Sequence, residues 1–507
     1  MRVFLHRGAL PLLLCLFAIL AWQPARAQDG RLAGFDEYAA QALRDWEVPG
    51  AGIAVLKDGR IALSRGYGVR TLGQSAPVTD RTLFAIGSTS KAFTAAAVGM
   101  LVDEGKLSWD DPVTKHLPGF QMYDPYVTRE LTVRDLLTHR SGLERGDLLW
   151  GAFGHDRDEL VRRMRYFKPT WSLRSTFGYQ NLMYLTAGQV AARIAGSSWD
   201  EIVRTRIFAP LGMKTSNTSV SRLADLSDVA TPHTRADGKV ESHPYRVIDN
   251  IGPAGSINSS AAELIEWVRL HLDGGKAGDR QLLSPAVMKE MHAPQTIIPN
   301  APPWSMLCPD AHFISYGLGW ILADYRGRKV VMHTGNIDGM SALVAMLPEE
   351  RLGLVVLTNM NGTMMPTALA YKVFDLFLGA SARDWSAEML KTVKAQLAQA
   401  PPPPAQTAGT SPTLKLDEYA GVYANDYYGE VRIALADGRL TMQLGSGLRF
   451  GLSHWHYDAF QAVQVDRAAN KALVNFTLNA AGKPETVRLN MRGLNDLLFH
   501  RANPPAR

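Results

Sequence analysis

From Ala92 to Met100 the chain is almost wholly apolar and rich in alanine, a pattern that predicts a helix. A helix that is apolar on every side belongs in the interior of a protein and not on its surface. Ser88 lies where this helix begins, and Lys91 follows three residues later, one turn along the same face. The pattern therefore predicts a hydroxyl group and an amine close together at the mouth of a buried helix.

This pair has the chemistry of a nucleophile and its base. A buried lysine loses solvation, which favours the neutral amine and lowers its pKa. A neutral amine can take the proton of a serine hydroxyl, and the helix N-terminus supports negative charge that develops nearby. The alternative is structural, with Ser88 capping the helix and Lys91 extending to solvent. A Ser-x-x-Lys spacing alone does not decide between the two.

Strand patterns lie on both sides of this helix in the sequence. Residues 52–68 predict a hairpin with a tight turn at Lys57-Asp58-Gly59. Three more apolar runs, at residues 329–333, 341–347 and 352–357, predict strands. Because strands lie at both ends and helices between them, we predict an α+β fold in which an antiparallel sheet is flanked by helices.

Helical periodicity and capping signals account for much of the middle of the chain. Thr132 and Asp135 have the spacing of a capping box, and His139 lies in the turn that follows, where we favour a hydrogen-bonding role over a catalytic one. Residues 144–170 are rich in charge without a clear period, and we expect them to form a surface excursion. Further helices are predicted at residues 182–195, 261–272 and 366–378, and another is predicted to start after Ser197-Ser198, with Trp199, Ile202 and Val203 on its core face.

The composition changes near residue 395. Four consecutive prolines make residues 396–412 a semi-rigid linker, and short strand-like runs with hairpin turns follow it. We therefore predict a first domain at residues 28–395 and a small all-β barrel at residues 413–507.

Residues 1–27 have the pattern of a secretory signal peptide. Arg2 and Arg7 precede an apolar run from Ala9 to Trp22, and a small-x-small site predicts cleavage after Ala27. The run is too short to cross a bilayer comfortably, so we expect a periplasmic or secreted protein without a stable membrane anchor. Of the two cysteines only Cys308 would remain, which excludes an internal disulfide in the mature chain.

Charge and motifs exclude several function classes. Without the three arginines of residues 1–27, the formal net charge falls from +6 to +3 over 480 residues, too little to predict a nucleic-acid partner. No Gly-x-Ser-x-Gly or His-Glu-x-x-His motif occurs, which argues against an α/β-hydrolase and against metal-assisted hydrolysis. The glycine-rich run at residues 252–256 lacks a Gly-Lys-Ser/Thr ending. We expect no cofactor and no metal.

Three short motifs together resemble a known family. Ser88-Thr89-Ser90-Lys91, Tyr179-Gln180-Asn181 and His333-Thr334-Gly335 occur in the order of the three motifs of penicillin-recognising serine enzymes. The nearest branch is similar to class C β-lactamases, DD-carboxypeptidases, D-aminopeptidases and related esterases. The last domain resembles the lipocalin-like barrel that follows some peptidases of this family. Taken alone, the tyrosine and the asparagine would be read as packing and as a helix cap.

The resemblance implies roles for individual residues. Ser88 would attack a carbonyl and form an acyl-enzyme, and Lys91 and Tyr179 would share the proton transfers, with the choice of base left open. Asn181 would bind a substrate amide. The backbone N–H groups of Ser88 and Asn336 would form the oxyanion hole.

The third motif departs from the class C lactamases, which have lysine where this chain has His333. Histidine is only partly charged near neutrality, so it would anchor a substrate carboxylate less firmly, and that binding would weaken as the pH rises. Gly335 would allow a ligand to approach the backbone closely, and Thr334 would contact the polar end of the substrate.

We therefore expect a serine hydrolase that cleaves peptide amides in a small-molecule or peptide substrate. A carboxylesterase or a weak class C-like β-lactamase is the close alternative. A non-hydrolytic covalent binder or sensor of peptidoglycan fragments or β-lactams is an alternative of another class. The last domain would shield the cleft, limit substrate size or form a homo-oligomer.

Overall fold

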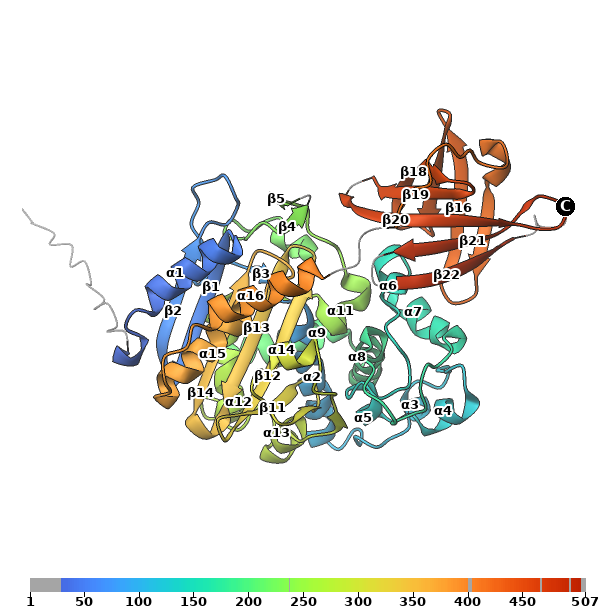
Figure 1. The fold of residues 1–507 in the computed structure, drawn as a ribbon. Coiled ribbons are helices and arrows are strands. Elements are labelled where there is room, and N and C mark those ends of the chain that lie inside the picture. Colours follow the sequence, from blue (N-terminus) through green and yellow to red (C-terminus); the bar gives the residue numbers. More distant parts are fainter. Residues whose placement is uncertain (1–28, 237, 400–403, 466, 492–493, 503–507) are drawn as a thin grey trace, which may run out of the picture.

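One eight-stranded antiparallel sheet unites the two ends of the first domain. The structure, a computed structural model, describes residues 29–502 apart from 237, 400–403, 466 and 492–493 (Figure 1). The expected signal peptide and three of the four linker prolines lie outside the described residues. The strand order is β2-β1-β14-β13-β12-β11-β10-β9. These strands are β1 (Gly50–Lys57), β2 (Arg60–Gly68), β9 (Thr296–Ile297), β10 (Ile314–Tyr316), β11 (Ile321–Tyr325), β12 (Arg328–Ile337), β13 (Met340–Leu347) and β14 (Leu352–Thr358).

The predicted hairpin and the predicted antiparallel sheet are confirmed. Asp58 and Gly59 both have positive φ angles, of 50° and 73°, as the tight turn between β1 and β2 requires. Every residue of β13 and β14 is buried, because helices cover both faces of the sheet (Figure 1). The covering helices are α1 (Phe35–Trp46), α15 (Met365–Leu378) and α16 (Trp385–Ala398) on one side and α12 (Ala261–Leu272) on the other.

The helix that follows Ser88 is buried as its composition predicts. It is α2 (Ser90–Asp103), entered through a single 3-10 turn at Gly87–Thr89, and it is buried from Ser90 to Leu101. It packs against α8 (Asn181–Ala195), which ends at Gly196 in the left-handed conformation. The remaining elements are α3 (Val113–His116), α4 (Pro125–Glu130), α5 (Val133–Leu136), α6 (Asp147–Ala152), α7 (Arg157–Arg163), α9 (Trp199–Val203), α10 (Ala209–Leu211), α11 (Gly252–Gly255), α13 (Pro285–Met291), α14 (Trp304–Leu307), and the short strands β3 (Phe84–Ala85), β4 (His233–Ala236), β5 (Lys239–Ser242), β6 (Asn258–Ser259), β7 (Lys276–Ala277) and β8 (Arg280–Gln281).

The expected surface excursion at residues 144–170 is wrong. The segment folds into α6, α7 and a 3-10 turn, and it buries Leu148, Leu149, Leu160 and Met164. Its charges misled the prediction because many of them pair with one another at the surface of these short helices, as Arg163 does with Glu159.

The C-terminal domain is a closed eight-stranded antiparallel barrel, which confirms the predicted all-β barrel. Closure occurs where the first strand pairs with the last, with Tyr423 opposite Arg501. Its strands are β15 (Gly421–Asn425), β16 (Gly429–Ala436), β17 (Arg439–Leu444), β18 (Arg449–His456), β19 (Ala459–Gln464), β20 (Arg467–Leu478), β21 (Pro484–Met491) and β22 (Leu494–Arg501).

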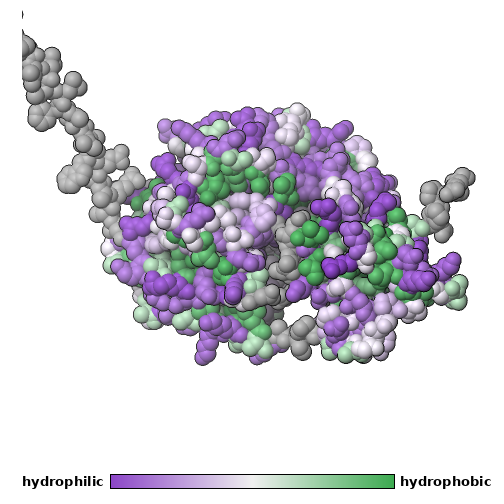
Figure 2. Space-filling model, turned by 90° about the horizontal axis from the view of Figure 1, so that it is seen from above, coloured by the Kyte–Doolittle hydropathy of each residue, from purple (hydrophilic) through white to green (hydrophobic). Residues whose placement is uncertain are grey.

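The visible surface of the molecule is mainly polar. Seen from above, hydrophilic residues cover most of the visible face, with separate apolar patches among them (Figure 2). Within the part of the chain that the structure describes, no helix combines the length and the apolarity that crossing a membrane requires.

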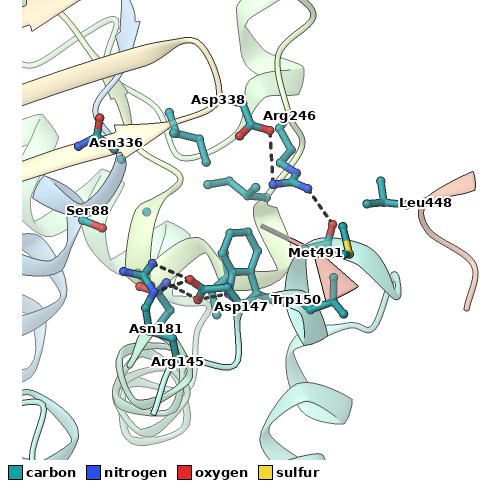
Figure 3. Close-up of a pocket in the computed structure, with 18 of the residues that line it drawn as sticks. Ser88, Arg145, Asp147, Trp150, Asn181, Arg246, Asn336, Asp338, Leu448 and Met491 are labelled. Carbon is teal, nitrogen blue, oxygen red and sulfur yellow. Dashed lines mark hydrogen bonds and ion pairs between the residues drawn. The ribbon is translucent and has the colours of Figure 1, made fainter. Parts of the chain in front are cut away.

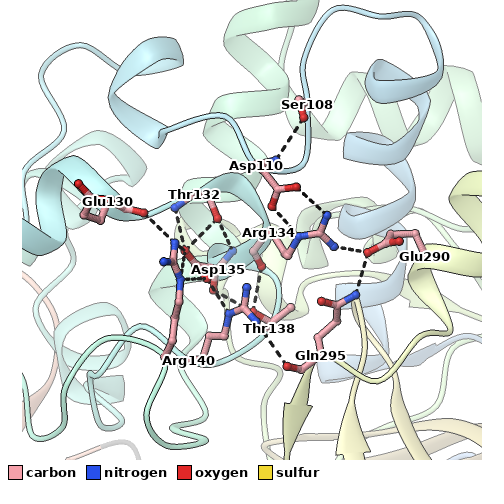
Figure 4. Close-up of polar contacts among 11 residues, drawn as sticks. Ser108, Asp110, Glu130, Thr132, Arg134, Asp135, Thr138, Arg140, Glu290 and Gln295 are labelled. Carbon is pink, nitrogen blue, oxygen red and sulfur yellow. Dashed lines mark hydrogen bonds and ion pairs between the residues drawn. The ribbon is translucent and has the colours of Figure 1, made fainter.

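A buried carboxylate fixes the start of the region that carries Tyr179. Asp135 is fully buried, and it accepts hydrogen bonds from the backbone and hydroxyl of Thr132, from Arg140 Nε at 2.6 Å and from Arg174 Nη2 at 2.7 Å (Figure 4). The predicted capping box is therefore present. Burial raises the pKa of Asp135, but the bonds from Arg174, Thr132 and Arg140 outweigh it and hold the pKa below its usual range.

The turn after α5 connects this cluster to the tyrosine loop. His139, at a φ of 55°, accepts a hydrogen bond from the backbone N–H of Gln180 through Nδ1 at 3.1 Å, and its carbonyl accepts one from Gly178 at 2.8 Å. The expected hydrogen-bonding role of this histidine is confirmed. The two contacts hold the backbone on either side of Tyr179.

Asp135→Ala should lower the free energy of unfolding of the first domain by about 3 kcal/mol, because it leaves two arginines without their buried partner. Asp110→Ala is the matched control, since Asp110 pairs with Arg134 but its side chain is 67% exposed, and its loss should cost at most about 1 kcal/mol. Urea unfolding of both variants checks this. The contribution of Asp135 is present above the ordinary Asp pKa of about 3.9 and is lost as the pH falls through its lowered folded value. Equal losses in the two variants would contradict the assignment.

Candidate active site

Ser88 and Lys91 lie in contact at the start of α2. Lys91 Nζ is 3.0 Å from Ser88 Oγ, and the lysine is fully buried whereas the serine is partly exposed. Nζ also donates hydrogen bonds to Asn181 Oδ1 at 2.8 Å and to the carbonyl of Ala254 at 2.8 Å. The amine therefore has three polar partners and no exposure to solvent.

Burial lowers the pKa of Lys91 well below its ordinary value, and the nearby positive charge of Arg145 lowers it further. The negative charge of Asp147 acts in the opposite direction but does not reverse the shift. The shift favours the neutral amine over the ammonium form.

The partners of a neutral amine show where its lone pair points. Such an amine has two N–H donors and one lone pair. The amide oxygen of Asn181 and the carbonyl oxygen of Ala254 can only accept, so they use both N–H groups. The lone pair is left for the hydroxyl hydrogen of Ser88, the third partner. This arrangement is that of a base directed at a nucleophile.

Close packing of three helices fixes the carbonyl of Ala254. The hydroxyl of Thr94 on α2 donates to the carbonyl of Pro253 at 2.6 Å. A Cβ at Gly188 on α8 would lie 2.3 Å from the ring of Pro253, so only glycine allows α8 and α11 to approach this closely. The glycine-rich run at residues 252–256 thus serves packing around Lys91.

Tyr179 lies in the loop that leads into α8. Its ring centroid is 4.8 Å from Lys91 Nζ, and the hydroxyl of Ser88 is near enough to influence the pKa of its phenol. Desolvation raises the pKa of Tyr179 to about 12, against the lowering by Arg145 and by the nearby hydroxyl of Ser88. The phenol keeps its proton at neutral pH. The neighbouring Gln180 caps α8, accepting from the N–H of Leu182, so Asn181 is not the helix cap.

Strand β12 brings its backbone against the turn that holds Ser88. A Cβ on Gly335 would lie 1.9 Å from the carbonyl oxygen of Ile86 and 3.3 Å from the N–H nitrogen of Ser88. A Cβ on Gly87 would lie 2.9 Å from the backbone nitrogen of Asn336. The glycines therefore let the backbone around Ser88 and Asn336 meet, which is the arrangement an oxyanion hole needs.

His333 is fully enclosed. Its Nε2 is 2.9 Å from the hydroxyl of Tyr316 and its Nδ1 is 2.6 Å from the carbonyl of Thr334. Burial, reinforced by the nearby Lys91, lowers the pKa of His333 to about 3. The expectation of partial charge near neutrality is therefore wrong for this histidine, because it was based on a solvated side chain.

A cavity of about 270 Å³ opens at Ser88 (Figure 3). Of the predicted site residues, Ser88, Asn181 and Asn336 line it, whereas Lys91, Tyr179, His333, Thr334 and Gly335 lie behind its wall or beside it. The complete lining consists of Gly87, Ser88, Arg145, Asp147, Leu148, Trp150, Gly151, Asn181, Arg246, Ile248, Ile251, Ala254, Gly255, Asn336, Ile337, Asp338, Leu448, Gln464 and Met491.

Two ion pairs in this lining were missed by the sequence prediction. Arg145 pairs with Asp147 at 2.5 Å and Arg246 with Asp338 at 3.4 Å, on different sides of the cavity (Figure 3). The signal for Arg145 and Asp147 was the Leu-Glu-Arg-Gly-Asp run just after the predicted turn, where a loop next to the site exposes polar groups. Nothing local in the sequence singles out Arg246 or Asp338.

The barrel forms part of the cavity wall. Leu448, Gln464 and Met491 of the barrel line it. The barrel docks on the segment that was expected to be a surface excursion: the N–H of Leu448 donates to the carbonyl of Ala152 at 2.9 Å, and the rings of Phe167 and Tyr427 stack at 4.3 Å. Side chains of both domains therefore border one site.

Metal binding has no basis in the described ranges, where no three His, Cys, Asp or Glu side chains gather in a way that would hold an ion.

Solved structures share the fold. The octameric penicillin-binding protein homologue from Pyrococcus abyssi aligns with a TM-score of 0.62 at 22% identity, covering 92% of this chain and 99% of that one. SurE aligns with a TM-score of 0.55 at 22% identity, covering 93% of this chain and 99% of that one.

Sequence comparisons extend over both domains. Residues 35–376 match the Beta-lactamase family and residues 405–501 match a domain of unknown function, DUF3471. Unguisins hydrolase ungD of Aspergillus violaceofuscus is 30% identical over 89% of this chain and 87% of its own length. Penicillin-binding protein 4 of Amycolatopsis lactamdurans is 32% identical over 63% of this chain and 83% of its own. The chain belongs to the beta-lactamase and penicillin-binding-protein-like family of serine hydrolases.

Proposed function

We propose that the protein hydrolyses peptide amide bonds through an acyl-enzyme on Ser88. The observation that carries the proposal is the buried neutral Lys91, whose lone pair faces the hydroxyl of Ser88 at 3.0 Å. In the acylation step Lys91 takes the hydroxyl proton while Ser88 Oγ bonds to the substrate carbonyl carbon. The backbone N–H groups of Ser88 and Asn336 stabilise the resulting oxyanion.

The raised pKa of Tyr179 suits the departure of an amine. An amine leaves only when its nitrogen receives a proton, and the phenol of Tyr179, with a pKa of about 12, has one to give at neutral pH. Lys91 then passes the proton that it took from Ser88 to the phenol of Tyr179, which restores the phenol. In deacylation these groups act in reverse: a water loses its proton to them, its oxygen bonds to the acyl carbon, and Ser88 leaves with a proton restored.

The surroundings of His333 support amides over charged lactams. A neutral histidine behind the cavity wall supplies no cation for a substrate carboxylate. Asn181 lines the cavity and has two amide N–H groups, of which one is donated to Asp147, so the other suits the carbonyl of a peptide. The relative named unguisins hydrolase, similar along most of this chain, supports hydrolysis as the reaction.

Ser88→Ala should abolish turnover of a panel of peptides, acyl esters and a chromogenic cephalosporin, because no other group can form the acyl-enzyme. Ser221→Ala, on an exposed turn, is the control and should leave every rate unchanged. Steady-state rates combined with intact-protein mass spectrometry check this. Peptides should be turned over fastest. A dominant ester or cephalosporin rate would replace the proposal by an esterase or a β-lactamase, and stoichiometric labelling without turnover would replace it by a covalent binder.

The pH dependence of kcat/KM should reflect the deprotonation of Lys91 alone over the pH range in which the protein is folded. Its deprotonated form is the base, so kcat/KM should rise through its lowered pKa and then stay level, since Tyr179 keeps its proton until about pH 12. His333, with a pKa of about 3, should add no inflection near 6.5. A rate that rises with a midpoint near 10.4, the ordinary lysine value, would contradict the mechanism.

The barrel wall should limit the size of the substrate. The double variant Leu448→Ala/Met491→Ala removes two side chains that line the cavity, and it should raise kcat/KM for bulkier peptides relative to small ones by about tenfold. Leu435→Ala is the matched control, because this leucine of β16 is exposed and outside the cavity lining. An unchanged size preference in the double variant would show that the barrel takes no part in selection.

A further inference from the structure

We propose that Asp147 is a positioning residue for the base: its carboxylate fixes which way the Asn181 amide faces, and the amide in turn directs the lone pair of Lys91 to Ser88. The inference rests on the proposed activation of Ser88 by Lys91, and it concerns no particular substrate. It assigns a role to Asp147, which lies in residues 144–170, outside the three sequence motifs.

The contacts of Asp147 are those of an acceptor surrounded by donors. Its Oδ1 accepts from Asn181 Nδ2 at 2.8 Å and from Trp150 Nε1 at 2.9 Å. Its Oδ2 accepts from Arg145 Nε at 2.7 Å. Burial raises the pKa of Asp147, but Arg145 and the donated hydrogen bonds outweigh it and hold the pKa below its usual range. The side chain is therefore an ionised carboxylate, which accepts and never donates.

An ionised carboxylate leaves the amide of Asn181 only one favourable orientation. The nitrogen end must face Asp147, and the oxygen end then faces Lys91, where it accepts from Nζ at 2.8 Å. With the amide turned over, its oxygen would face the carboxylate and its N–H₂ group would face the amine. Two acceptors would then oppose each other without a hydrogen between them, which is unfavourable.

The orientation of this amide decides the direction of the lone pair. A reversed Asn181 would donate to Lys91, and the lone pair would be taken up there instead of facing Ser88. The amine would still be neutral and still be 3.0 Å from the hydroxyl, but it would present an N–H group where a base is required. Asp147 therefore acts on the reaction without touching the reacting atoms.

Charge provides a second, independent signature. Lys91 is faced by Arg145 and Asp147, by the histidines His139 and His333, and by aromatic rings including Tyr179 and Tyr184. Burial lowers the pKa of both histidines, so they are neutral. The charges that bear on the amine are the arginine and the aspartate. Removing the charge of Asp147 should lower the pKa of Lys91, and removing the charge of Arg145 should raise it.

The experiment measures the rate at which a fluorophosphonate labels Ser88. Intact-protein mass spectrometry detects the labelled protein, and the rate is determined at a series of pH values. The Ser88 Oγ–phosphorus bond forms, fluoride leaves, and the hydroxyl proton passes to Lys91, so the rate reports the base without a peptide substrate. Failure of peptide hydrolysis would leave this readout intact.

Asp147→Ala should slow labelling by about 100-fold in the wild-type background and by less than threefold in an Asn181→Ala background, because the aspartate acts through the asparagine. Asp156→Ala is the control for the segment: it removes the cap of the adjacent α7, outside the cavity, and should leave the labelling rate unchanged. A loss below threefold in Asp147→Ala, or an equal loss in both backgrounds, would overturn the proposal.

Two further variants keep the proposal testable if Asp147→Ala does not fold. Asp147→Asn retains an acceptor oxygen for Asn181 but not the charge, so it should keep the labelling rate within about tenfold and move the acid limb of the pH profile to lower pH. Arg145→Gln should move that limb to higher pH. The assigned roles would be contradicted if the acid limb moved in the same direction in both variants, or if it moved in neither variant.

Discussion

The removal of water from one amine is the constraint on which the site depends. Lys91 can act as a base only while it is neutral, and it is neutral because α2 is apolar around its whole circumference and lies between the sheet and α8. The same burial would make an unpaired amine costly, so both of its N–H groups are satisfied, by Asn181 and by Ala254. The hydrophobic core and the catalytic pair are thus two consequences of one packing arrangement.

The elements with strong local signals could be predicted from the sequence. The alanine-rich helix, the Asp58-Gly59 hairpin, the capping box of Thr132 and the strands of the central sheet all lie where their patterns indicate. The contact between Ser88 and Lys91 was predictable because helical spacing alone brings the two residues together. Such features depend on residues close in the sequence.

The features that could not be predicted from the sequence depend on residues that are far apart in the chain. His333 is kept neutral by burial, reinforced by the nearby Lys91, and its hydrogen-bond partner Tyr316 belongs to another strand. No motif in the sequence reports that burial. Residues 144–170 looked solvated because charged residues are frequent in them, whereas most of their apolar side chains are buried and the barrel docks on this segment. The cavity consequently combines a family-typical nucleophile with two arginines that are each already paired to an aspartate, Arg145 to Asp147 and Arg246 to Asp338. These four side chains balance in charge, which suits a polar uncharged substrate group.

The protonation of Lys91 in the free protein tests the account most directly. Protein labelled with ¹³C at lysine Cε can be titrated by NMR, and the Lys91→Gln variant identifies the resonance by its absence. The account predicts a midpoint well below the ordinary lysine pKa of about 10.4 and a neutral amine at pH 7. A midpoint near that ordinary value would show a charged lysine beside Ser88, and Lys91 would not be the base.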